Sequence, residues 1–100
     1  MKPRVLCVDD DPSVLAAYRR NFRHTFEVDV ASDSDEALTK VRNQVPFAVV
    51  VSDMRMPGMN GLELLTQVRE RQPQAARVIL SGYADQHLVS QRNAGVHRLH

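Results

Sequence analysis

Three acidic side chains stand where short apolar runs of the sequence end. Asp9 and Asp10 follow the run at residues 4–8, and Asp53 follows the run at residues 47–51. If these runs are neighbouring parallel strands, their carboxyl ends meet at one sheet edge, where open α/β sheets bind ligands. The carboxylates would then repel one another by roughly 1–4 kcal/mol for each pair at about 4 Å. A bound cation would relieve this repulsion.

Carboxylate oxygens and retained waters are the ligands that Mg²⁺ prefers. We therefore expect Asp10 and Asp53 to bind Mg²⁺ directly, and Asp9 to act through a water molecule. The backbone carbonyl of Arg55 is a candidate for a further ligand. In the competing interpretation, Asp9, Asp10 and Asp11 are only loop residues and a helix cap. We accept this interpretation for Asp11, which we expect to cap the following helix.

A hydroxyl group is expected at the same edge. Ser81 directly follows the apolar residues 78–80, which are typical of a buried strand. Its hydroxyl could donate a hydrogen bond to a phosphoryl oxygen. A Ser-Gly pair is also ordinary turn chemistry, so the weight of Ser81 comes from its position after the strand.

Apolar runs that alternate with helical periods must position these side chains. Strands are predicted at 4–8, 27–30, 47–51 and 77–80, and helices at about 12–23, from 32–34 to about 43, from about 62 to before Pro73, and at about 85–93. This alternation predicts a doubly wound α/β fold, a parallel sheet with helices on both faces. The alternating run at 27–30 predicts an edge strand, and the continuous runs predict central strands, which gives the order 2-1-3-4.

Composition narrows the class of protein. The chain has 100 residues, of which 43% are hydrophobic and 25% charged, with a net charge of +1. These values predict one globular domain without a nucleic-acid partner. One cysteine, Cys7, excludes an internal disulfide and is expected to be buried. No apolar stretch is long enough to cross a membrane and no signal peptide is apparent, so we expect a cytoplasmic location.

Three segments carry a family resemblance. They are Val-Asp-Asp-Asp-Pro at 8–12, Ser-Asp-Met-Arg-Met-Pro-Gly-Met-Asn-Gly at 52–61 and Ile-Leu-Ser-Gly-Tyr-Ala-Asp at 79–85. Together they closely resemble the receiver domain of bacterial two-component response regulators, the CheY-like family. The resemblance covers the whole chain and implies the flavodoxin-like form of the doubly wound fold.

The resemblance also implies a function. Asp53 would be the phosphoacceptor, taking a phosphoryl group from a sensor histidine kinase or a small phosphodonor. Asp9 and Asp10 would hold Mg²⁺, and the hydroxyl of Ser81 would bind the acyl phosphate. Such a domain is not a turnover enzyme. It passes its signal to an output domain or an effector protein.

The sequence departs from the family at its C-terminal end. Complete receivers carry a full fifth strand, a lysine after it and a fifth helix, whereas this sequence stops at His100 and has only Lys2 and Lys40. We therefore expect residues 1–100 to be a receiver domain that is truncated, with at most a stub of strand 5 at 96–100 and no fifth helix. The uncovered edge predicts a homodimer, with the fourth helix and residues 96–100 in the contact.

Two alternatives remain. One is an interaction module that works without phosphorylation through the uncovered edge. The other is a phosphohydrolase of the HAD type, in which Asp9 would be the nucleophile and Asp11 the acid. The residue that takes the phosphoryl group separates the readings, because a receiver uses Asp53 and a HAD enzyme uses Asp9.

Overall fold

The computed structural model describes residues 2–43, 46–80 and 96–99, and places their strands in one parallel sheet of order β2-β1-β3-β4-β5. The strands are β1 (Arg4–Val8), β2 (Glu27–Ala31), β3 (Val49–Asp53), β4 (Ala76–Leu80) and β5 (Val96–Leu99). The helices are α1 (Pro12–Phe22), α2 (Ser34–Asn43) and α3 (Gly61–Arg71). The predicted α/β class and the order 2-1-3-4 are confirmed, and β5 is a short strand beside β4.

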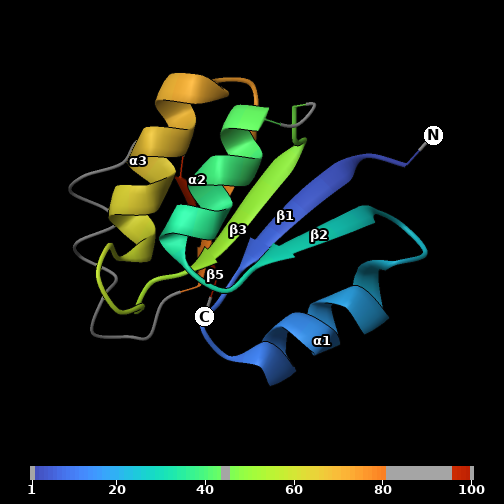
Figure 1. Ribbon diagram of the computed structural model, residues 1–100. Helices are drawn as coiled ribbons and strands as arrows, with labels where there is room; N and C mark the ends of the chain where they lie inside the picture. The colour runs from blue at the N-terminus through green and yellow to red at the C-terminus, as the bar shows by residue number, and fades with distance from the viewer. Residues whose placement is uncertain (1, 44–45, 81–95, 100) are drawn as a thin grey trace.

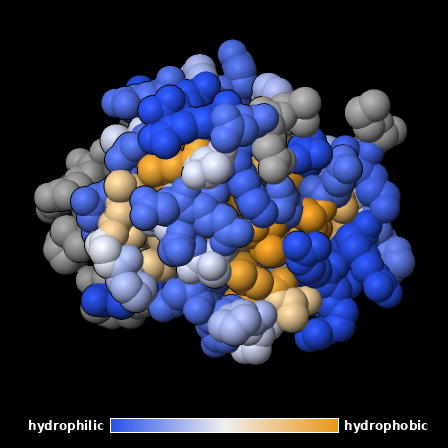
Figure 2. Space-filling model, viewed as in Figure 1, coloured by the Kyte–Doolittle hydropathy of each residue, from blue (hydrophilic) through white to orange (hydrophobic). Residues whose placement is uncertain are grey.

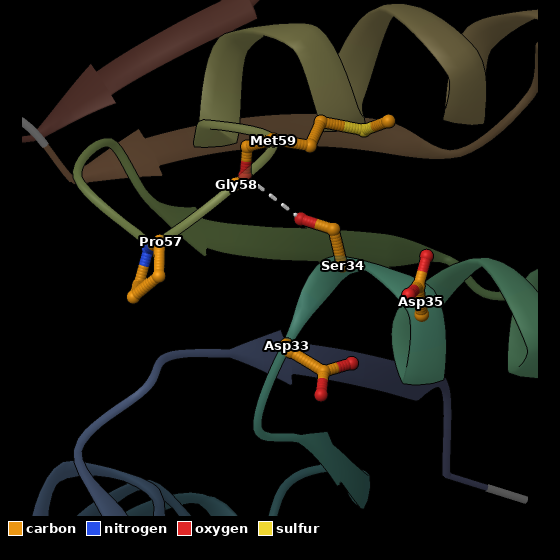
Figure 3. Close-up of a pocket in the computed structure, with 6 residues that line it drawn as sticks. All are labelled: Asp33, Ser34, Asp35, Pro57, Gly58 and Met59. Atoms are coloured by element: carbon orange, nitrogen blue, oxygen red, sulfur yellow. Dashed lines mark hydrogen bonds between the residues drawn. The ribbon is translucent and has the colours of Figure 1, made fainter.

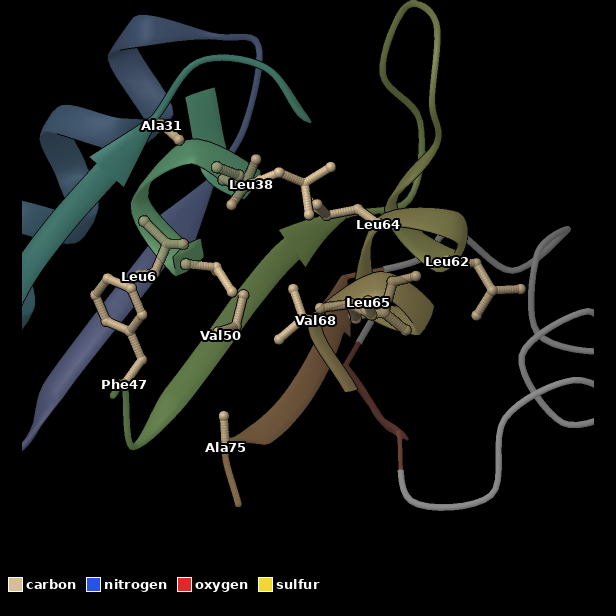
Figure 4. Close-up of a cluster of buried hydrophobic side chains, with 14 of the residues drawn as sticks. Leu6, Ala31, Leu38, Phe47, Val50, Leu62, Leu64, Leu65, Val68 and Ala75 are labelled. Atoms are coloured by element: carbon tan, nitrogen blue, oxygen red, sulfur yellow. The ribbon is translucent and has the colours of Figure 1, made fainter. Parts of the chain in front are cut away.

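Two apolar layers hold the sheet between its helices. The larger core lies between the sheet and the pair α2 and α3, and includes Leu6, Val50, Leu64, Leu65 and Ile79 (Figure 4). The smaller core joins the sheet to α1 (Figure 1). In Figure 2 apolar side chains reach the surface over the strands, between α1 and the other two helices, and also in the region of α2 and α3. Helices therefore cover both faces, as the doubly wound prediction required.

Strand β3 corrects one predicted boundary. The apolar run suggested a strand at 47–51, but β3 begins at Val49 and ends at Asp53. Phe47 is buried at 2% exposure, yet its backbone N–H donates to the side-chain oxygen of Gln72 at 2.8 Å and does not join the sheet. Burial and strand pairing are separate properties, and an apolar run reports only burial. The burial of β3 on both faces is also incomplete, because Val49 and Val51 are only partly buried beside α1.

Helix starts follow local capping chemistry. Asp11 caps α1, as expected, and its carboxylate accepts hydrogen bonds from the Ser13 N–H at 2.9 Å and the Ser13 hydroxyl at 2.7 Å. For α2 the sequence left three candidate caps open. The structure selects Asp33, whose carboxylate accepts the Glu36 N–H at 2.8 Å. Asn60 caps α3 through a reciprocal capping box with Glu63.

Part of the prediction lies outside the described residues. Ser81, the predicted helix at about 85–93 and residue 100 belong to this part of the chain. None of the helices that the structure describes is long and apolar enough to cross a membrane.

Candidate functional site

Three carboxylates meet at the carboxyl ends of β1 and β3. Asp9, Asp10 and Asp53 each offer an oxygen within 4.8 Å of the others. Asp9 is buried, Asp53 is half-buried and Asp10 is exposed, so the cluster opens to solvent on one side. The structure thus brings together the three acidic residues that the sequence singled out. An all-oxygen donor set of this kind suits a hard divalent cation.

The electrostatics of the cluster favour a cation. Burial raises the pKa of Asp9, and the charge of Asp10 raises it further, although the Asp11 N–H donates to Asp9 and lowers it. Burial likewise raises the pKa of Asp53, and the charge of Asp9 adds to this effect. Both shifts mean that the ionised forms are disfavoured in the absence of a positive charge. A cation would reverse this tendency.

Backbone contacts fix Asp9 in place. Its N–H donates to the carbonyl of Ala31 at 3.1 Å, which extends the pairing of β1 with β2 by one residue. Its carboxylate accepts the Asp11 N–H at 2.9 Å. The Asp9 side chain is therefore held between the end of a strand and the first turn of α1.

Asp53 is positioned by α3 as well as by β3. It is the last residue of β3 and lies in register with Leu80 of β4. Its backbone carbonyl accepts the buried hydroxyl of Ser52 at 2.9 Å, and Gly61 packs directly against that carbonyl. Ser52 and Gly61 were not predicted as positioning residues. The available signal was the Asn-Gly pair at 60–61, which stands directly before the predicted third helix.

The loop after Asp53 is tied to two elements. The Met54 N–H donates to the carbonyl of Leu80 at 3.0 Å, and the Gly61 N–H donates to the carbonyl of Met54 at 2.9 Å. The backbone N–H of Arg55 donates to Asp53 and lowers the pKa of that carboxyl group. These bonds hold the backbone beside the acidic cluster. A role for the Arg55 carbonyl as a ligand remains a prediction.

A depression of about 380 Å³ separates this loop from the start of α2 (Figure 3). It is lined by Asp33, Ser34, Asp35, Pro57, Gly58 and Met59. The Ser34 hydroxyl donates to the Met59 carbonyl at 3.0 Å across one side of it. The depression is thus closed on that side by a bond between α2 and the loop, and the carboxylate of Asp33 is already engaged in capping.

Asp11 does not have the surroundings of a catalytic acid. Its carboxylate caps α1, and the Ser13 hydroxyl and N–H lower its pKa. A general acid needs the opposite shift, because it must hold a proton near neutral pH. The predicted acid of the HAD alternative is therefore committed to a structural role.

Sequence comparison identifies the family that this geometry suggests. The model of the response regulator receiver domain matches residues 5–98. The chain belongs to the response regulator receiver family. This confirms the resemblance expected from the three motifs. Receiver domains of this family are signalling modules that act with histidine kinases and output domains, and the homology supports a role in phosphorelay signalling.

Relatives of this receiver include transcriptional regulators. It is 43% identical over 81 residues to the hydrogenase transcriptional regulatory protein HoxA of Cupriavidus necator, covering 81% of this chain and 17% of that protein. It is 38% identical over 95 residues to the transcriptional regulatory protein PrrA of Mycobacterium tuberculosis, covering 94% of this chain and 39% of that protein. The receiver therefore spans less than half of either relative.

A solved structure confirms the fold of the receiver. The crystal structure titled adenylate cyclase from Rhodopirellula baltica superposes with a TM-score of 0.88 at 36% identity. The match covers 91% of this chain and 67% of that one. The sheet and helices described above thus have the same arrangement as in that solved structure.

Proposed function

We propose that Asp53 is the phosphoacceptor of a phosphorelay. The observation that carries this proposal is the convergence of Asp9, Asp10 and Asp53 within 4.8 Å at the ends of β1 and β3. A carboxylate oxygen of Asp53 attacks the phosphorus of a phosphohistidine, forming a P–O bond as the P–N bond breaks. The departing imidazole takes a proton, and Asp53 becomes an acyl phosphate. Ser81, which lies outside the described residues, is proposed to donate to a phosphoryl oxygen.

The metal in this proposal is Mg²⁺. The donor set fits it, because three carboxylates meet there, of which Asp10 is exposed, Asp53 half-buried and Asp9 buried. The Arg55 carbonyl is proposed as a further ligand. When bound, Mg²⁺ neutralises charge on the transferring phosphoryl group. The chain itself orients Asp53 through β3 and the contact with α3.

The partners follow from the same chemistry. A sensor histidine kinase or a small phosphodonor supplies the phosphoryl group, and an output domain or effector protein receives the signal. The chain acts as an acceptor and not as a turnover enzyme. A homodimer through residues 96–100 and the predicted fourth helix, and a cytoplasmic location, remain parts of this proposal. The dimer would use the sheet end opposite β2, where β5 is the outer strand.

The decisive experiment is phosphorylation by acetyl phosphate with Mg²⁺, followed by intact mass and peptide mapping. We expect one phosphoryl group on the parent chain and none on Asp53→Asn. Asp35→Asn is the matched control, because Asp35 is an exposed carboxylate in the first turn of α2, outside the acidic cluster. It should be modified as the parent is. Modification of Asp53→Asn would overturn the assignment, and modification at Asp9 would favour the HAD alternative.

Beryllofluoride distinguishes the receiver from an interaction module. It forms an acyl phosphate mimic on a carboxylate, so with Mg²⁺ it should shift the backbone amide resonances around Asp53 and Gly61. Resonances of the parent that do not respond to either reagent would favour a module that works without phosphorylation.

A further inference from the structure

Strand β2 forms one end of the sheet, so half of its backbone groups face away from β1. The Glu27 N–H donates to the Pro3 carbonyl, and the Ala31 carbonyl accepts the Asp9 N–H. Residues 27, 29 and 31 therefore bond to β1, and residues 28 and 30 direct their N–H and C=O groups outward. Outward groups of this kind are a template for pairing with another strand.

Side chains already occupy the outward groups of Val30. Its N–H donates to the Asp29 carboxylate at 2.9 Å, and its carbonyl accepts the Lys40 ammonium at 2.7 Å. Lys40 also donates to that same carboxylate of Asp29 at 2.7 Å. The two side chains and the Val30 peptide groups thus form one closed set of bonds on the outer edge.

A second acidic residue, Glu36 of α2, continues this pattern. The Glu36 carboxylate accepts the N–H of Ser32 at 2.7 Å and its hydroxyl at 3.1 Å, just beyond the end of β2. Glu36 also lies 3.9 Å from the Lys40 ammonium, one helical turn away. We call Asp29, Glu36 and Lys40 the β2-edge cluster.

The central pair of the β2-edge cluster is well shielded. The side chains of Lys40 and Asp29 are only 22% and 23% exposed. Lys40 lies on α2, whose Leu38 and Val41 are buried in the larger core, so its position is set by helix packing. Salt screens such a pair less than an exposed one, and another strand could reach Val30 only by displacing it.

We propose that the outer edge of β2 is a strand-pairing surface that the β2-edge cluster keeps closed. When the cluster is removed, the partner that fits this edge is the β2 edge of a second copy of the chain. This inference goes beyond the phosphorelay function, because it concerns neither Asp53 nor the Mg²⁺ site.

The second copy is favoured by the side chains of β2. Val28 and Val30 lie on the α1 side of the sheet and are only partly buried there. Two β2 strands related by a two-fold axis would place these valines on the same face of the joined sheet and bury them further. Each copy would also supply a backbone N–H for the Val30 carbonyl of the other copy, which has lost the Lys40 ammonium as its donor.

The test replaces Lys40 with Met, which keeps an unbranched apolar stem and removes the ammonium. Lys2→Met is the matched control, since this substitution makes the same change of charge, and among the described residues the Lys2 ammonium donates to the Arg23 carbonyl at an exposed site. Pairing through β2 is detected by a spin label attached after Glu27→Cys, at an exposed position where β2 begins. Cys7 is fully buried, and burial raises its pKa to about 11, so the label goes to position 27.

We expect Lys40→Met to show a short distance between labels of two copies, with association about tenfold stronger or more than in the parent. Lys2→Met and Lys40→Arg should behave as the parent does, because Arg keeps a cation at position 40. A dimer through β5 would not bring the position-27 labels together, so the two modes are distinguished.

A second variant guards against simple unfolding. Asp29→Asn keeps an oxygen for the Val30 N–H and leaves Lys40 beside the Val30 carbonyl, but it removes the ion pair that holds the Lys40 ammonium there. It should therefore also associate, more weakly than Lys40→Met. Circular dichroism establishes that each variant is folded before its association is measured. If folded Lys40→Met or folded Asp29→Asn shows the same label distances and association as the parent, the β2-edge cluster does not close this edge and the inference is wrong.

Discussion

Gly61 lies so close to the backbone carbonyl of Asp53 that a side chain at position 61 would overlap the carbonyl oxygen. A Cβ atom there would also stand 2.9 Å from the buried Ser52 hydroxyl, which itself bonds to the same carbonyl. The first residue of α3 is therefore part of the support of the proposed phosphoacceptor. Any movement of α3 away from β3 would change the position of Asp53.

Replacing Gly61 with Ala should lower the free energy of unfolding by about 1–3 kcal/mol, because the added methyl group forces α3 away from β3. It should also weaken the beryllofluoride response of Asp53. Chemical denaturation and amide resonances measure the two effects. Gly58→Ala is the control: its φ of +76° costs about 1–2 kcal/mol, but no atom lies within 4 Å of an added Cβ. An intact beryllofluoride response in Gly61→Ala would contradict this role of Gly61.

Mg²⁺ should stabilise the folded chain by relieving repulsion among the three carboxylates. At a concentration a hundredfold above its dissociation constant, a ligand adds roughly 2.7 kcal/mol to the free energy of unfolding. Asp10→Asn should reduce this increment and raise the stability of the metal-free form, since one like charge is gone. Thermal melting with and without Mg²⁺ checks both. If millimolar Mg²⁺ does not change the melting temperature of the parent, the proposed metal site is contradicted.

Without metal, Asp53 should make the fold less stable as pH rises. Burial and the charge of Asp9 raise the pKa of Asp53 above its ordinary 3.8, so between these two values the folded state binds more protons than the unfolded state. Stability is therefore lost as pH rises through this window. Asp53→Asn should be more stable than the parent at neutral pH, and the difference should vanish below pH 3.8.

Asp29→Asn should change stability with pH in the opposite direction to Asp53→Asn. Burial acts to raise the pKa of Asp29, but the Lys40 ammonium outweighs it and the pKa is lowered. Asp29 therefore contributes stability at neutral pH that is lost as pH falls below 3.8. Denaturation at several pH values should show the two Asn variants diverging in opposite directions from the parent. Parallel pH profiles would contradict both assignments.

Gln72 should be the most costly of the described glutamines to replace. Its buried amide accepts the Phe47 N–H at 2.8 Å and donates to the Val41 carbonyl at 2.9 Å, joining α2, α3 and the start of β3. Gln72→Leu leaves both backbone groups without this partner, which should cost about 2–4 kcal/mol. Gln74→Leu, at an exposed position, should change stability by less than about 0.5 kcal/mol. Urea titration compares them, and equal midpoints would refute this assignment.

The local and periodic features were predictable from the sequence alone. Alternating apolar runs and helical periods predicted the strand order, and that order brought Asp9, Asp10 and Asp53 to one edge. The cap at Asp11 and the burial of Cys7 were likewise predictable, because each depends on a few neighbouring residues. In a parallel sheet the carboxyl ends of neighbouring strands lie at the same edge, whatever the details of side-chain packing. Residues that follow each strand in the sequence therefore come together in one site.

Tertiary structure decided the contacts between elements that are far apart in the sequence. The alternation at 27–30 predicted an edge strand, but not that Lys40 of α2 would cover Asp29 and the outer edge at Val30. Arg77 was expected only as part of a buried strand, and its guanidinium reaches the Leu65 carbonyl of α3 at 3.5 Å. The start of β3 was set by Gln72, and the place of Asp53 by Gly61. Periodicity records which face of an element is apolar, but not which atom of another element will meet it.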